Sequence, residues 1–357
     1  MMNVRLPSRG RVAARGFTLI ELMVAIVLGL ILLAALIALL VSTITSRNEL
    51  DKTTRQIDNG RYALQVLSEN IQLAGYVGAS GSTAFSYVTP VACPTTLADL
   101  GYAPQTNPGT SKVPFPVYMP SAVPACIDHV VAGTSMVLVT RLSTSAVLVS
   151  AAAAGEQYVQ VSNCATDTQP FVVAAGSSKA NFNLMQKDCS TSNLAPIRKI
   201  VQQIYYLSSC NQCGKDTIPT LKVAEWVNGA IAISPLVEGV ENFQVEFGLD
   251  MDGNGSPDCY VSNPESPAAA EINVAICPQT ATPYGWTDAA TNWSNVMTAR
   301  VHVLARNVDA TGGWTDTKTY DLGLANPTVG PFNDGYKRHA YSTVTRLYNP
   351  SGQREVQ

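Results

Sequence analysis

The chain has 357 residues, with 23 basic and 26 acidic side chains, a formal charge of −3 and eight cysteines. Beyond the first 16 residues no extended Lys/Arg cluster occurs, so the sequence does not support binding to nucleic acid through its phosphates. The three histidines, His129, His302 and His339, are far apart, and neither a His-Glu-x-x-His nor a Gly-x-Ser-x-Gly motif is present. We therefore do not expect an enzyme.

The N-terminal region combines a basic segment with a long apolar one. The first 16 residues contain no acid and four basic residues, Arg5, Arg9, Arg11 and Arg15. By the positive-inside rule this end stays in the cytoplasm and the bulk of the chain lies outside it. Residues 17–41 carry a single charge and, at about 1.5 Å of rise per residue, can cross a hydrocarbon core of about 30 Å. A secretory signal is cleaved after a shorter apolar core, so processing here must precede the core.

The junction Gly16-Phe17-Thr18-Leu19-Ile20-Glu21 resembles the processing motif of type IV pilins and type II secretion pseudopilins. The resemblance implies that a membrane-embedded prepilin peptidase cleaves between Gly16 and Phe17 and that the new Phe17 amine is methylated. Residues 1–16 are then a prepilin leader, and 17–41 are a transmembrane helix that later enters a filament core. Loss of the leader removes four basic residues and no acid, which changes the formal charge from −3 to −7.

Glu21 is the single charge of the apolar segment. An intramembrane carboxylate costs at least about 2.5 kcal/mol on insertion scales, which makes it a functional candidate. The resemblance implies an assembly salt bridge between Glu21 and the N-terminal amine of a neighbouring subunit. The alternative is a tolerated Glu21 that is protonated or snorkels in a plain membrane anchor.

The apolar pattern continues with a helical period beyond the membrane segment. Its apolar residues recur every seven positions, with two more on the same side: Leu50, Ile57, Leu64 and Ile71, then Leu67 and Ala74. We expect one helix from Phe17 to about Leu73, with 42–77 as an amphipathic half that packs on a globular domain. Gly60 should weaken this helix internally, and Gly75 should terminate it.

Three further segments, 59–78, 235–245 and 337–347, resemble the PilW family of minor pilins. In the first of them, Gln72 stands where the family commonly has a basic residue. Between 79 and 199 only 135–142 looks familiar. This variable stretch is therefore expected to set partner specificity.

Alternating or β-branched runs predict strands at 135–142, 158–161, 171–174, 200–207, 240–248, 299–306 and 341–347. Residues 79–125 are rich in Ser, Thr, Gly and Pro and are expected to be loop held by cysteines. We predict an α+β, pilin-like fold in which the long N-terminal helix packs on an antiparallel β-sheet with disulfide-tied loops. Residues 78–235 would be a variable loop and strand region, and 236–357 a sheet region with an Asp-rich loop.

All eight cysteines follow the membrane segment, and an even number in an oxidising compartment indicates disulfides. Connectivity cannot be deduced from sequence alone. Proximity favours Cys93 with Cys126, Cys164 with Cys189, Cys210 with Cys213, and Cys259 with Cys277. The Cys210-Asn211-Gln212-Cys213 motif is interpreted as a local disulfide that closes a tight loop; a redox motif or half of a zinc site are the alternatives.

An Asp-rich segment offers the oxygen ligands of an EF-hand-like calcium loop at Asp250, Asp252, Asn254, Ser256 and Asp258. The position of the closing bidentate Glu is occupied by Val261, so Glu265 or water would have to complete a Ca²⁺ site. The equally favoured alternative is a hairpin loop in which these residues supply turn geometry. No other cofactor is predicted.

The resemblance implies a non-enzymatic minor pilin that helps initiate type IV pilus assembly and lies at or near the tip, serving motility, adhesion or DNA uptake. Expected partners are other minor pilins, the major pilin, the prepilin peptidase, the inner-membrane assembly platform and a large tip adhesin. Before assembly the chain would be a single-pass inner-membrane protein with a periplasmic C-terminal domain. Two alternatives stay open. One is a J-like minor pseudopilin of type II secretion, against which 236–248 argues; the other is a binding module built from 79–199.

Overall fold

The structure is a computed structural model that describes residues 16, 18–78, 85–104, 111–277 and 284–355. Phe17 and residues 1–15 of the leader therefore lie outside the described residues. Helix α1 (Leu19–Gln72) occupies the predicted helical region, and the chain divides within it into two compact units, Met1–Asp51 and Lys52–Gln357. Among the described residues, α1 is the one helix long and apolar enough to cross a membrane. Its most apolar window has a mean hydropathy of 3.3 and is not buried.

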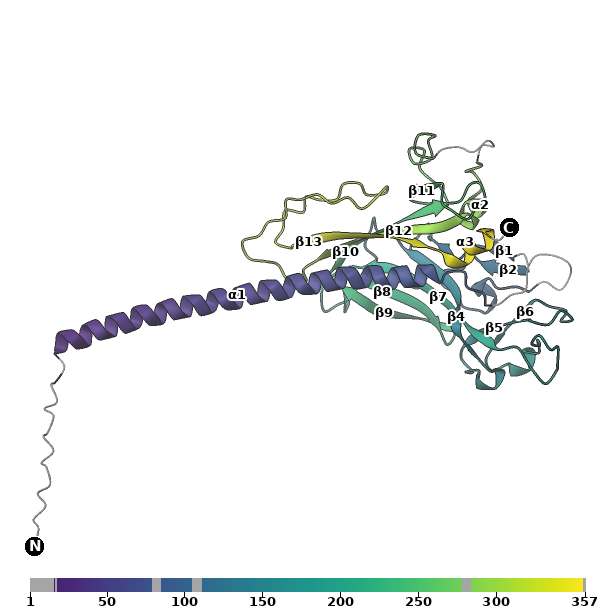
Figure 1. Ribbon diagram of the computed structural model, residues 1–357, viewed down its shortest axis with the longest axis horizontal. Helices are drawn as coiled ribbons and strands as arrows, with labels where there is room; N and C mark the ends of the chain where they lie inside the picture. The colour runs from purple at the N-terminus through teal and green to yellow at the C-terminus, as the bar shows by residue number, and fades with distance from the viewer. Residues whose placement is uncertain (1–15, 17, 79–84, 105–110, 278–283, 356–357) are drawn as a thin grey trace, which may run out of the picture. The chain divides into compact units, whose positions relative to one another are not determined.

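The second unit contains two antiparallel sheets (Figure 1). In the larger sheet the order is β3-β4-β7-β5-β6, with β8 paired to β7 and β9 to β8. Its strands are β3 (Val117–Tyr118), β4 (Val137–Val147), β5 (Gln157–Val161), β6 (Phe171–Ala175), β7 (Ile197–Ser208), β8 (Thr220–Val227) and β9 (Ala230–Glu238).

The smaller sheet has the order β11-β10-β12-β13. Its strands are β10 (Val240–Leu249), β11 (Cys259–Val261), β12 (Val296–Arg306) and β13 (Arg338–Arg346). Strands β1 (Phe85–Val88) and β2 (Ser111–Pro114) form a separate parallel pair. The short helices are η1 (Ala98–Leu100), η2 (Val149–Ala151), η3 (Lys179–Asn181), α2 (Ala289–Ser294) and α3 (Tyr348–Glu355).

One apolar core joins both sheets to the second half of α1. The larger sheet contributes Val137 and Val139 from β4, and the smaller sheet contributes Phe243 and Val245 from β10. The core side of α1 is lined by Ala63, Leu67, Ile71 and, just beyond the helix, Ala74, all fully buried. The helix therefore covers apolar faces of both sheets, as expected for an α+β fold in which each layer needs the other.

The predicted apolar face of α1 is confirmed in its later part, where Leu67, Ile71 and Ala74 are fully buried, and is wrong in its earlier part. Leu50 is 68% exposed, and Ile57 and Leu64 are half-buried. Gly60 takes the place of a large residue, because a Cβ there would lie 2.3–2.8 Å from ring atoms of Tyr341 in β13. Gln56 is also buried, and its amide donates to the carbonyl of Ala305 in β12 at 2.9 Å. The heptad pattern therefore identified the later part of this face, whereas around Gly60 close packing against β13 requires a small residue.

Gly60 is thus a packing requirement and not a weak point, while Gly75 has a φ of 72° just beyond the helix, as a terminator should.

The α+β class is confirmed, but the structure has two antiparallel sheets where one was predicted. Residues 79–125, expected to be loop, contain β1, β2 and β3. The β8–β9 hairpin was missed because β8 is largely buried on both faces and lacks alternation, while β9 contains Pro235. The expected region boundary at 235/236 falls inside β9.

Substitution of Gly60 by Ala should lower the free energy of unfolding by about 1–3 kcal/mol, although Ala favours helix by about 1 kcal/mol. In a Tyr341→Ala background the same change should be neutral or stabilising, because the clash is gone. Denaturant unfolding of the full chain in detergent measures both. The control is Gly29→Ala, where a Cβ meets nothing within 4 Å. Stabilisation by Gly60→Ala in both backgrounds would contradict the packing argument.

Candidate functional site

The start of α1 is a capping box formed by Thr18 and Glu21. The Thr18 amide and hydroxyl both donate to Glu21 Oε2 at 2.9 Å, and the Glu21 amide donates to Thr18 Oγ1 at 3.3 Å. These bonds satisfy two backbone N–H groups that a helix start leaves without partners. Thr18 was not singled out from the sequence, although Thr-x-x-Glu before an apolar run is the signature of this motif.

The apolar surface that follows is exposed along its whole length. Every large apolar side chain between Leu19 and Val41 is more than half exposed. A continuous apolar surface of this size must be covered by lipid or by other subunits. Glu21 therefore carries two functions in one side chain: it caps its own helix, and its charge lies within the surface that such a partner covers.

A buried arginine holds the long connection between β12 and β13 on the sheet. Arg338, at the start of β13, has a fully buried side chain that pairs with Asp316 at 3.0 Å, with Asp334 at 2.6 Å and with Glu241 of β10. Its guanidinium carbon lies 3.7 Å from the centre of the Phe332 ring. The hydrogen bond from Arg338 lowers the pKa of Asp334 against the opposing effect of burial. Two segments that resemble the PilW family, 235–245 and 337–347, meet in this cluster.

The same connection is fixed a second time at Glu246. The Glu246 side chain, 2% exposed, accepts from the backbone amide of Leu324 at 2.8 Å and from Arg300 at 2.7 Å. The connection is therefore attached to β10 at two separate points, Glu241 and Glu246.

Within the connection, Asp316 also accepts hydrogen bonds from the Tyr320 hydroxyl. Burial and this contact raise the pKa of Tyr320 to about 12, so the hydroxyl remains a donor.

Asp316→Asn should lower the free energy of unfolding by about 2 kcal/mol or more, because it removes a fully buried counter-charge of Arg338. Glu355→Gln is the matched control: it breaks the Arg346 pair, whose side chains are 39% and 47% exposed, and should cost less than about 1 kcal/mol. Urea unfolding midpoints at constant m-value give both numbers. Equal costs would mean that the cluster does not stabilise the fold.

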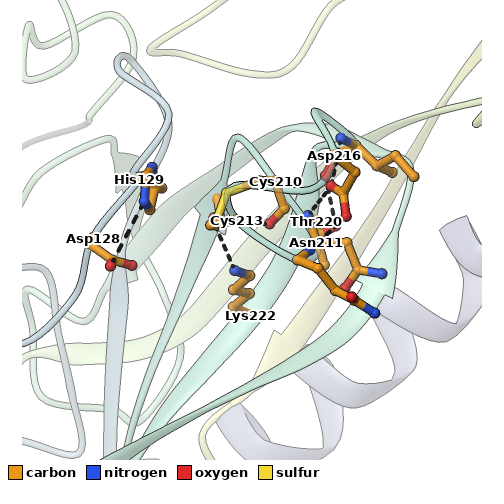
Figure 2. The surroundings of a disulfide bond; sticks show 11 residues. Asp128, His129, Cys210, Asn211, Cys213, Asp216, Thr220 and Lys222 are labelled. Carbon is orange, nitrogen blue, oxygen red and sulfur yellow. Dashed lines mark hydrogen bonds and ion pairs between the residues drawn. A yellow bond between two sulfur atoms is a disulfide. The ribbon is translucent and has the colours of Figure 1, made fainter.

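The structure forms four disulfides, Cys93–Cys126, Cys164–Cys189, Cys210–Cys213 and Cys259–Cys277. These are the four pairs that sequence proximity favours. The first two tie loops of the variable region, and the fourth links β11 to the segment after it. Figure 2 shows that His129, distant in sequence, lies beside the Cys210–Cys213 pair.

The Asp-rich loop is organised around Asp250, whose carboxylate is buried. It accepts from the amides of Gly253, Asn254 and Gly255 at 2.7–3.1 Å and pairs with Arg354 of α3 at 2.9 Å. Burial raises the pKa of Asp250, but the Gly255 amide and Arg354 outweigh it and lower the pKa overall.

The remaining members of the predicted set also serve the loop itself. Asp252 accepts from the Asn254 amide, Asn254 from the Ser256 amide, and Asp258 from the Met251 amide at 2.6 Å. The carboxylates of Asp250, Asp252 and Asp258 lie within 4.8 Å of one another, but Glu265 is not in this group and accepts instead from the Trp293 indole. The loop has the hydrogen bonds of the hairpin-loop alternative, and Arg354 supplies a counter-charge to Asp250. The three carboxylates also lie close enough together to hold a metal ion, so calcium binding stays a prediction.

Arg354→Met should therefore lower the thermal midpoint, because it leaves Asp250 buried without its counter-charge. Replacing EDTA by millimolar Ca²⁺ should leave the wild-type midpoint unchanged. Thermal unfolding of the full chain in both buffers tests the two statements together. A rise with Ca²⁺ that Asp252→Asn abolishes would establish the calcium alternative.

Two family models match the chain. Residues 204–349, from β7 to the start of α3, match the model described as Type IV Pilus-assembly protein W, and residues 11–37 match the prokaryotic N-terminal methylation motif. No curated protein matches the chain. A solved type IV-like pilin from Thermus thermophilus is similar at 12% identity and a TM-score of 0.34, covering 83% of this chain and 98% of that chain.

A methylation motif that leads into an exposed apolar helix, with a β-rich unit after it, defines a type IV pilin-like protein. Its C-terminal part, residues 204–349, carries a domain that matches the PilW family.

Proposed function

We propose that this protein is a minor pilin that helps initiate type IV pilus assembly and remains at or near the pilus tip. The observation that carries the proposal is the union of two features in one chain: the motif and exposed apolar surface of a filament subunit, and the PilW-matching unit from β7 to α3. No catalytic arrangement is needed for this role. The match favours a pilus subunit over the J-like pseudopilin.

The proposed partners follow from the same scaffold. The prepilin peptidase would act between Gly16 and Phe17, the inner-membrane assembly platform would receive the processed helix, and other minor pilins and the major pilin would cover its apolar surface. Before assembly the β-rich unit would lie in the periplasm. A large tip adhesin is the proposed partner of the variable region, whose disulfides Cys93–Cys126 and Cys164–Cys189 would hold a binding surface in shape.

Peptide mass spectrometry of sheared surface filaments, compared with the membrane fraction, tests the proposed role. Trace amounts in the filaments, with a methylated N-terminus at Phe17, are expected for a minor pilin. Processed protein confined to the cell envelope would instead indicate a pseudopilin or an assembly factor.

Two substitutions of Glu21 separate its charge from its capping function. Glu21→Ala removes both, whereas Glu21→Gln keeps an oxygen that can accept from Thr18 but removes the charge. If the carboxylate pairs with a neighbouring amine, both variants should insert in the membrane and both should reduce pilus number severalfold. Pilus counts by electron microscopy, normalised to membrane protein level, give the result. Normal counts with Gln but not Ala would show that capping alone is needed, and normal counts with both would refute the pairing.

A further inference from the structure

The Cys210–Cys213 disulfide lies in an environment different from a plain structural cross-link. Lys222 of β8 is 6% exposed, and its ammonium donates to Cys213 Sγ at 3.4 Å (Figure 2). Among the described residues no ion pair within 4.0 Å is formed by this ammonium, and Asp216 attracts it only at longer range. A disulfide sulfur is a weak, neutral acceptor, so the oxidised pair compensates a buried cation poorly.

A Cys213 thiolate would supply the counter-charge that the disulfide lacks. Thiolates are favoured beside lysine and histidine, and the ring of His129 lies with both sulfurs inside a 4.8 Å group. The Ser208 hydroxyl lies 3.6 Å from Cys210 Sγ and 3.8 Å from Cys213 Sγ, so it can donate to either sulfur after the bond opens.

The surrounding loop is also held by hydrogen bonds that do not involve the disulfide. Asp216 accepts hydrogen bonds from the amides of Asn211 at 2.8 Å, Gln212 at 2.7 Å and Ile218 at 3.1 Å. The hydrogen bond from Gln212 is the main reason that the pKa of Asp216 is lowered. In sequence the pair is separated by 3 residues, against 33, 25 and 18 for the other three disulfides. Since a cross-link constrains the unfolded chain less when its loop is short, opening this one costs the fold least.

We propose that Cys210–Cys213 is a thiol–disulfide exchange site, which a protein or small-molecule dithiol opens reversibly and whose reduced form is stabilised by Lys222. Cys213 is half-buried whereas Cys210 is 4% exposed, so Cys213 Sγ is the sulfur that an incoming thiolate reaches. The His129 side chain beside it is half exposed.

The exchange proceeds in two balanced steps. A thiolate of the dithiol attacks Cys213 Sγ, a mixed disulfide forms, and the electron pair of the broken bond leaves on Cys210 Sγ, which takes a proton. The second thiolate of the dithiol then attacks its own partner sulfur, and the electron pair leaves on Cys213 Sγ beside the Lys222 ammonium. The dithiol loses two electrons and two protons; Cys210 keeps one proton, and the other passes to solvent.

The experiment equilibrates the full-length protein in detergent with graded ratios of reduced to oxidised dithiothreitol, followed by alkylation and peptide mass spectrometry. We expect Cys210–Cys213 to open at ratios that leave the other three disulfides closed. Lys222→Met should need a roughly tenfold higher ratio, as for loss of one charge-assisted hydrogen bond. The matched control is Lys215→Met, an exposed lysine of the same loop, which should not change the ratio.

Lys222→Arg keeps the charge and should stay near the wild-type ratio. The three remaining disulfides, probed in the same spectra, report that each variant is folded. The proposal is overturned if all four disulfides open together. It is also overturned if the Cys210–Cys213 disulfide of Lys222→Met opens at the wild-type ratio, as that of the control Lys215→Met should.

Discussion

The fold depends on the close approach of α1 to the sheets along Gly60, Ala63, Leu67 and Ile71. Small residues at the first two positions let the helix backbone approach β13, where the Tyr341 ring occupies the space that a side chain at Gly60 would need. Larger residues further along fill the core shared by both sheets. Because one helix covers apolar faces of both layers, a change in its register or rotation would uncover both sheets at once.

The same helix is used in two ways along its length. In the second unit its buried face includes one polar side chain, Gln56, which donates to the main-chain carbonyls of Ala305 and Lys337. These two carbonyls lie at the two ends of the connection that Arg338 and Glu246 hold. In the first unit it buries no apolar side chain between Leu19 and Val41, which leaves that surface for lipid or neighbouring subunits. A compact β-rich unit joined to an exposed apolar helix suits a filament subunit.

The cysteines divide into two groups by their surroundings. Three disulfides close loops of 18 residues or more, where a cross-link removes much freedom from the unfolded chain. The fourth closes a loop that Asp216 already holds and places a buried ammonium against one of its sulfurs. The first group is suited to permanent stabilisation in an oxidising compartment, and the last is suited to exchange.

The features that could be predicted from the sequence alone depend on residues that are close together in the chain. The length and apolarity of 17–41, the Gly16–Glu21 motif, the alternating strands β10 and β12, and the proximity of paired cysteines are all features of short range. Tertiary structure decided the rest, because it depends on which surfaces meet. The sequence pattern identified Leu67 and Ile71 on the buried face of α1, but only the approach of Tyr341 shows why Gly60 lies on it and Leu50 does not. Other contacts join residues that no sequence pattern connects. Arg338 pairs with Asp316 and Glu241, and Arg354 pairs with Asp250. His129 and Lys222 both lie beside Cys213.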